Sequence, residues 1–181
     1  MDVPTHLQAY WQDFVQAFEQ GARRATGSPP GEPRSDPATR FYEAFHFDDN
    51  APSADELAAL VLAGRKRATA ALALSYELSG KPMPRPGDLS IVTRFSGEPV
   101  CVIETRRIEI VPFNEVGEAF AATEGEGDGS LAFWRQAHTA FFGRECQRLG
   151  RTFSEDLRVV CEEFAVVHPA AGAPAASPSA A

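Results

Sequence analysis

The chain has 181 residues, enough for one domain with a substantial core. Its 44% hydrophobic and 23% charged residues are ordinary for a soluble globular protein, and no apolar run is long enough to span a bilayer. The formal net charge of −8 argues against a protein that coats itself with a polyanion through its overall charge, although clustered cations can still form a local basic cleft.

The first 40 residues are predicted to form a helix and a connection. Apolar residues recur at three- and four-residue spacing over residues 5–24, which predicts a helix with one packed stripe. The Pro-, Gly- and Ser-rich segment that follows predicts a flexible connection. No basic segment or long apolar core opens the chain, so we expect no signal peptide and a cytoplasmic protein. Three cysteines lack metal-ligand spacing and are expected to be reduced core residues.

After residue 40 the pattern mixes short strands and helices. A helix over 54–63 is expected to begin at Ser53 as its N-cap, with Glu56 completing a capping box. The segment 70–77 has no helix breaker and is expected to continue as a short helix. The expected strands cover residues 41–47, 89–95, 100–105, 107–111 and 157–167, and further helices cover 113–122 and 130–149.

Several short strands joined by tight turns favour a small β-barrel, so we predict an α+β fold in which a small barrel is flanked by helices. The C-terminal tail contains only Ala, Pro, Ser and Gly, which cannot bury a core. The predicted organisation is an N-terminal helix over 1–27, a flexible linker over 28–40, a main domain over 41–168 and a disordered tail over 169–181.

A cluster of cations follows the expected helix stop at Gly64. Arg65, Lys66 and Arg67 are consecutive, and Thr69 comes three residues after the lysine. If the segment turns, Lys66 and Thr69 face one cleft, where a lysine can activate a hydroxyl nucleophile or hold an anion. The alternative is that the cations complement the dipole of the preceding helix, which we favour for Arg65.

An acidic, glycine-rich loop covers residues 124–129. Glycines let the backbone turn tightly, and the carboxylates of Glu124, Glu126 and Asp128 suit a general base or a hard divalent cation such as Mg²⁺. The alternative is that Asp128 or Ser130 caps the next helix, which we favour for that end of the loop. We expect a catalytic role for Glu124 and, if a cation binds, Glu126 and Asp128 as its ligands.

The helix expected over 130–149 carries three candidate functional side chains. Trp134 and His138 are four residues apart, and Arg135 and His138 are three apart. Such a face can present an aromatic ring for base stacking, a cation for phosphate or carboxylate recognition, and a proton carrier. The alternative is a packed tryptophan beside a histidine that is hydrogen-bonded to the backbone.

Several motifs occur in a specific order along the chain. They are Gly-Arg-Lys-Arg-Ala-Thr-Ala at 64–70, Pro-Gly-Asp at 86–88, the strand at 99–105, the acidic loop with Ser-Leu at 124–131, and Trp-Arg-Gln-Ala-His with Phe-Phe within 134–142. Over roughly residues 41–167 this combination resembles the ASCH domain family. The resemblance implies a PUA-like β-barrel flanked by helices, with a cleft that handles RNA or a modified nucleoside.

The resemblance also implies two activities. Some small members look like amidohydrolases that remove an acyl group from the exocyclic amine of acetylated cytidine. Lys66, Thr69 and Glu124 match their motif, with Thr69 as nucleophile, Lys66 as its activator and Glu124 as the acid/base group. Longer members resemble RNA-binding proteins that cleave single-stranded RNA with a divalent cation, and this chain looks more like that subgroup. Arg67 stands where a threonine is frequent, which leaves the lysine–threonine pair intact.

We therefore predict an RNA-interacting protein that hydrolyses single-stranded RNA or a modified nucleoside. The alternatives are an N4-acetylcytidine amidohydrolase, a non-catalytic RNA-binding module and a small-molecule sensor. The only cofactor suggested is Mg²⁺, no membrane partner is expected, and Lys66→Ala is expected to abolish activity without changing thermal stability. The expected catalytic residues are Lys66, Thr69, Glu124 and His138, and the expected substrate-binding residues are Arg65, Arg67, Tyr76, Trp134 and Arg135.

Overall fold

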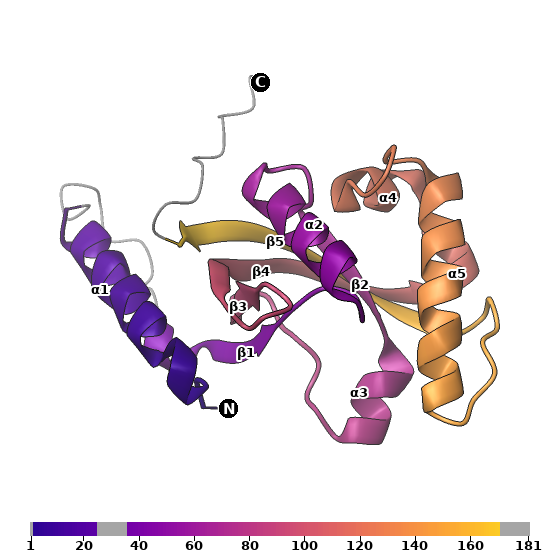
Figure 1. Cartoon of the computed structure of the whole chain (residues 1–181), viewed down its shortest axis with the longest axis horizontal. Coiled ribbons are helices and arrows are strands. Elements are labelled where there is room, and N and C mark those ends of the chain that lie inside the picture. The colour runs from indigo at the N-terminus through magenta and orange to yellow at the C-terminus, as the bar shows by residue number, and fades with distance from the viewer. Residues whose placement is uncertain (1, 25–35, 171–181) are drawn as a thin grey trace.

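The computed structural model describes residues 2–24 and 36–170. Its strands are β1 (Phe41–Phe45), β2 (Ala68–Leu72), β3 (Leu89–Thr93), β4 (Pro99–Pro112) and β5 (Arg158–Pro169). They form one mixed sheet in the order β1-β3-β4-β5-β2, in which β1 is parallel to β3 and the other neighbours are antiparallel (Figure 1). The sheet has two edges and is therefore not a closed barrel.

Helices surround this sheet, which confirms the predicted α+β fold with an N-terminal helix. They are α1 (Gln8–Arg24), α2 (Ala51–Leu62), α3 (Ala73–Ser79), α4 (Glu118–Glu124) and α5 (Leu131–Arg148), with 3₁₀ turns at Thr5–Leu7, Pro37–Thr39 and Phe113–Glu115. The two longest helices, α1 and α5, lie at opposite ends of the molecule (Figure 1). Among the described residues, no helix has the length and apolar character needed to cross a membrane.

The core consists of three apolar clusters that fix the helices to the sheet. The first places Leu7, Trp11 and Phe14 on residues of β1, β3 and β4. The second packs Ala58 and Val61 of α2 against the sheet. The third lies beneath α4 and α5 and contains Leu72, Phe113, Val116, Ala121, Trp134, Phe142, Cys146, Val159 and Cys161. All three cysteines are buried and free, as expected.

Strand β2 corrects the prediction of a helix over 70–77. Its alanines pair in antiparallel register with β5, from Ala68 opposite Glu163 to Leu72 opposite Val159, and the helix begins only at Ala73. Alanine favours helix by local propensity, but the ladder with β5 outweighs that small preference. Strand β4 is likewise one continuous strand where two were predicted, with an irregular register between Thr105 and Arg107.

Two helix starts also differ from the prediction. Helix α2 begins at Ala51, because the side chain of Asn50 accepts a hydrogen bond from the Ser53 amide and acts as the N-cap. The helix expected over 113–122 is a 3₁₀ turn followed by α4. Residues 25–35 and 171–181, which contain most of the predicted linker and tail, lie outside the described residues.

Candidate functional site

A cleft of about 810 Å³ is lined by residues of both edge strands of the sheet, β1 and β2. It is lined by residues of α2, β2, α3, α5 and the loop before α5, which come from distant parts of the chain. This volume lies within the range of small-molecule sites, about 300–1,000 Å³. Of the expected site residues, the cleft lining contains Thr69, Tyr76, Glu124, Glu126 and His138.

A buried lysine joins two carboxylates at one wall of the cleft. The Lys66 Nζ atom lies 2.9 Å from Glu124 Oε1 and 2.5 Å from Glu126 Oε1. Lys66 and Glu124 are each 1% exposed, so this is an ion pair almost without solvent. Lys66 is not among the described residues that line the cleft, and it contacts the cleft lining through these two carboxylates. The structure therefore brings together the cation cluster and the acidic loop of the sequence.

The other side of Glu124 is held by α5. The indole Nε1 of Trp134 donates a hydrogen bond to Glu124 Oε2, and His138 Nε2 lies 3.6 Å from Glu124 Oε1. The Trp134 and His138 rings are stacked with centroids 4.2 Å apart, and His138 Nδ1 lies 3.0 Å from the Trp134 carbonyl oxygen. The structure thus matches the alternative of a packed tryptophan beside a histidine that contacts the backbone, and both side chains also contact the Glu124 carboxylate. Trp134 is not among the described residues that line the cleft.

Burial and charge together set the protonation states of this cluster. Burial disfavours the charged form of Lys66, but Glu124 and Glu126 outweigh that effect and raise its pKa. Burial likewise opposes ionisation of Glu124, yet Lys66 and His138 lower its pKa to about 2. Burial also disfavours the imidazolium form of His138, and Glu124 reverses this and raises the His138 pKa. Lys66 is therefore an ammonium and Glu124 a carboxylate at neutral pH.

Backbone hydrogen bonds hold the two segments that carry Lys66 and Glu124. Gly64 at φ 73° ends α2, and the amides of Arg65 and Lys66 both donate to the Leu60 carbonyl. The Arg67 amide then donates to the Thr123 carbonyl over 3.0 Å, which ties the lysine segment to the end of α4. These bonds place Lys66 and Glu124 side by side although 58 residues separate them.

Gly125 is the point of closest approach between the two segments. Its φ is 67°, and a Cβ atom there would lie 2.2 Å from the Arg65 carbonyl oxygen. We expect Gly125→Ala to lose about 1–3 kcal/mol from the backbone conformation alone, with an additional loss from the clash. Gly129→Ala is the matched control, because Gly129 has a φ of 75° and open space around its Cβ position. Urea unfolding measures the free energy of unfolding of both variants. Equal losses in Gly125→Ala and Gly129→Ala would contradict the explanation from the close approach to Arg65.

Thr69 lies on β2 at the floor of the cleft. Its side chain is half-buried, and its hydroxyl forms no hydrogen bond with any described residue, so the hydroxyl is free for a substrate. On the neighbouring strand β5, Glu162 is its direct register partner, and Glu162 also lines the cleft. The sequence analysis did not select Glu162. A signal was present, since Glu162 shares one face of its strand with the buried residues Val160 and Phe164.

The expected substrate-binding arginines do not gather in the cleft. Arg65 and Arg67 are exposed, and Arg65 Nη2 donates to the Gly127 carbonyl at 3.2 Å. Arg135 donates to the carbonyls of Asn114 and Val116, which is a structural contact between α5 and the preceding turn. None of these three arginines is among the described residues that line the cleft.

The acidic loop does not fit the divalent cation considered for it. Lys66 already occupies the carboxylate of Glu126, and the exposed Asp128 accepts a hydrogen bond from the Ser130 amide. Ser130 in turn accepts one from the Phe133 amide, which realises the helix-capping alternative. Within residues 2–24 and 36–170, no group of three or more His, Cys, Asp or Glu side chains is arranged to hold a metal ion.

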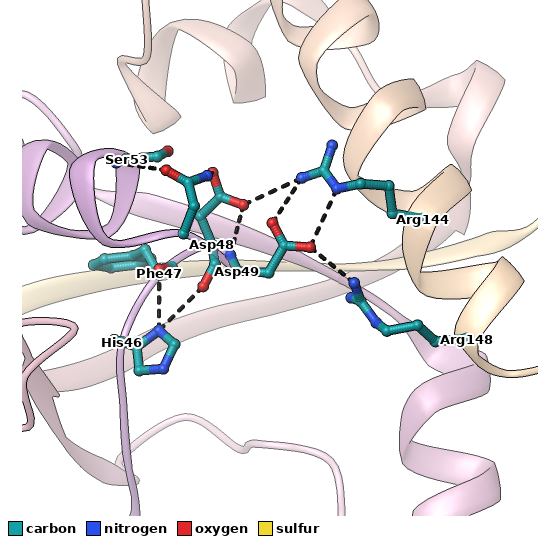
Figure 2. Close-up of polar contacts among 8 residues, drawn as sticks. His46, Phe47, Asp48, Asp49, Ser53, Arg144 and Arg148 are labelled. Carbon is teal, nitrogen blue, oxygen red and sulfur yellow. Dashed lines mark hydrogen bonds and ion pairs between the residues drawn. The ribbon is translucent and has the colours of Figure 1, made fainter.

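An ion-pair network missed by the sequence analysis joins α5 to the loop before α2 (Figure 2). Arg144 Nη2 lies 2.9 Å from Asp49 and 3.4 Å from Asp48, and Arg148 Nη1 lies 2.8 Å from Asp49. Asp48 and Arg144 both line the cleft, so the network spans one side of it. These arginines hold the pKa of Asp49 below its usual range. No short motif marks this network, because its partners lie 95 or more residues apart.

Comparisons with known proteins agree with this architecture. The ASCH domain model matches residues 43–168. A crystal structure of an ASCH domain from Lactobacillus crispatus JV V101 is 36% identical, with a TM-score of 0.79 over 93% of this chain and 98% of that one. A protein from Enterococcus faecalis V583 is 28% identical, with a TM-score of 0.66 over 87% of this chain and 90% of that one.

No curated protein matches the chain. The family model covers most of the chain, and the match to the ASCH domain structure supports a PUA-like fold. ASCH domains are associated with RNA in general. With the fold, the order of the motifs and the family model in agreement, the chain belongs to the ASCH domain family.

Proposed function

We propose that this ASCH domain hydrolyses a modified nucleoside and removes an acyl group from the exocyclic amine of a cytosine base. The observation that carries this proposal is the 2.9 Å contact between Lys66 and Glu124 at the wall of a nucleoside-sized cleft that also contains the free Thr69 hydroxyl. A hydroxyl nucleophile, a fixed ammonium charge and an oriented carboxylate are the components of acyl-transfer chemistry.

The charge of the cleft supports a nucleoside over an RNA strand. Its permanent cations are Lys81 and Arg144, and each is already paired with a carboxylate. Such a lining repels a chain of phosphates but offers acceptors for the N–H groups of a base. The carboxylates that line the cleft are those of Glu43, Asp48, Glu56, Glu124, Glu126, Glu145 and Glu162.

The protonation states support the following roles for the residues. Lys66 is charged, so it acts as a fixed positive charge behind Glu124 and Glu126, where it is a positioning residue. Glu124 is held by Lys66 and Trp134 and is a very weak base, so it orients N–H donors of the substrate. Thr69 attacks the acyl carbon and becomes the transient ester.

Metal-assisted cleavage of single-stranded RNA, the other predicted activity, has less support. Its proposed ligands Glu126 and Asp128 are engaged by Lys66 and by the Ser130 amide. We therefore derive no step through Mg²⁺.

The test compares the wild type with Thr69→Val and Thr69→Ser on N4-acetylcytidine. We expect the wild type to release cytidine and acetate, Thr69→Val to lose on the order of 10³-fold or more in kcat, and Thr69→Ser to keep measurable turnover. Chromatography of the nucleoside products measures the rates. Equal rates for the wild type and Thr69→Val would remove Thr69 from the mechanism. Salt-dependent binding of short single-stranded RNA without any product would favour a binding module instead.

A further inference from the structure

Thr69 and Glu162 form a cross-strand pair on the cleft floor. They are direct register partners in the antiparallel pair of β2 and β5, and both line the cleft. Directly opposed residues of an antiparallel pair project to the same face, with Cβ atoms about 4.5–5.5 Å apart. The two side chains therefore lie beside each other in the cleft lining, and because no direct hydrogen bond joins them, one water molecule would carry the proton between them.

One oxygen of Glu162 is fixed and the other is free. Thr105, which is 2% exposed, donates its hydroxyl to Glu162 Oε1 at 2.5 Å and orients the carboxylate. The second oxygen forms no hydrogen bond with a described residue, and it is not fully enclosed by protein. The Glu162 carboxylate thus has a fixed orientation and one oxygen that is free to accept a proton. A general base needs both properties.

The surroundings of Glu162 also suit it to proton transfer. Burial raises the pKa of Glu162 to about 7, and the Thr105 hydrogen bond opposes that rise. A carboxyl group with a pKa near the working pH is both ionised enough and basic enough to act as a general base. The groups that interact electrostatically with Glu162 are Glu43, Asp88, Lys81, Tyr42 and Tyr76.

The buried pair of Lys66 and Glu124 is less suited to this role. Lys66 carries its proton at neutral pH and has no lone pair to offer. Glu124 accepts hydrogen bonds from Lys66 and Trp134 on its two oxygens. Neither group of this ion pair is therefore suited to accept the Thr69 proton, whereas Glu162 is the direct register partner of Thr69.

We propose that Glu162 is the general base that activates Thr69. This inference rests on the proposed function. Thr69 Oγ1 bonds to the acyl carbon while its proton passes to the Glu162 carboxylate. The C–N bond then breaks, and the same proton passes to the departing exocyclic amine. Water next attacks the Thr69 ester and gives a proton to Glu162, which returns it to Thr69 Oγ1 as the carboxylic acid leaves.

The experiment uses the full chain, N4-acetylcytidine and the variant pair Glu162→Gln and Glu163→Gln. Glu163 is the matched control, because it adjoins Glu162, points to the other face of β5 and pairs with Arg107. We expect Glu162→Gln to lower kcat about 10²–10⁴-fold with little change in substrate Kd, and Glu163→Gln to resemble the wild type. The wild-type kcat is expected to rise with pH to a plateau above about pH 7, and Glu162→Gln should lack that rise.

Thr105→Val provides a second measurement that does not remove the carboxylate. The Thr105 hydrogen bond lowers the Glu162 pKa, so its loss should move the rise of kcat to higher pH. Equal kcat values for Glu162→Gln and Glu163→Gln, or an unshifted pH profile in Thr105→Val, would overturn the role of Glu162 and leave the proposed function intact. Absence of turnover in the wild type would overturn both.

Discussion

Replacing Lys66 by alanine is expected to lower the free energy of unfolding by about 3–5 kcal/mol, because it leaves buried Glu124 without its cation. The lysine side chain is 1% exposed and its Nζ contacts both Glu124 and Glu126. The sequence alone favoured unchanged stability for this variant, and the burial of the ion pair reverses that expectation. Urea unfolding at neutral pH measures the loss.

The loss in Lys66→Ala should also depend on pH. Without the ammonium, burial favours the neutral form of Glu124, so the deficit should shrink as the solution becomes acidic and that carboxyl takes up a proton. Arg65→Ala is the control, because Arg65 is an exposed neighbour whose side chain contacts the Gly127 carbonyl, and a change within about 0.5 kcal/mol is expected. Similar losses of unfolding free energy in Lys66→Ala and Arg65→Ala would show that the buried Lys66 ion pair stabilises the fold no more than an exposed contact does.

The second large effect is an acid-induced loss of stability that originates at Glu124. Its pKa is about 2 in the folded protein and has an ordinary value of 4.5 when free, so the fold binds the ionised form more strongly. The resulting stabilisation, on the order of 3 kcal/mol, is fully present above about pH 5 and is lost as the pH falls toward 2. Urea unfolding between pH 2 and pH 7 measures this slope.

Glu124→Gln should remove most of that acid dependence, because the amide does not titrate. Glu118→Gln is the control, since Glu118 is an exposed residue of the same helix α4, and it should keep the wild-type slope. His138 acts in the opposite direction. Its raised pKa adds stability below about pH 6.5, and this contribution is lost as the pH rises through the folded-state pKa. If the free energy of unfolding of Glu124→Gln still falls as steeply with decreasing pH, carboxyl groups other than Glu124 cause the acid-induced loss of stability.

The elements with a strong local pattern could be predicted from the sequence. The apolar stripe of α1, the run of β-branched residues in β3 and the regularly spaced aromatic residues of α5 each identify an element without any tertiary information. Strand β2 could not be found in this way. Its alanine-rich sequence favours helix, and it becomes a strand because β5 supplies a partner for its backbone.

The candidate site could likewise be predicted only in part from the sequence. The sequence selected Lys66 and Glu124 because a cation cluster and an acidic loop can match each other and the family motif contains both residues, and it selected His138 from its helix face. The register of β2 and β5 decided that Glu162 faces Thr69, and the packing of α5 on the loop before α2 decided the Asp49 network. The sequence by itself determines which chemical groups are present and how they are spaced along the chain. The contacts between groups that are distant in the sequence follow from strand pairing and helix packing, which only the folded chain establishes.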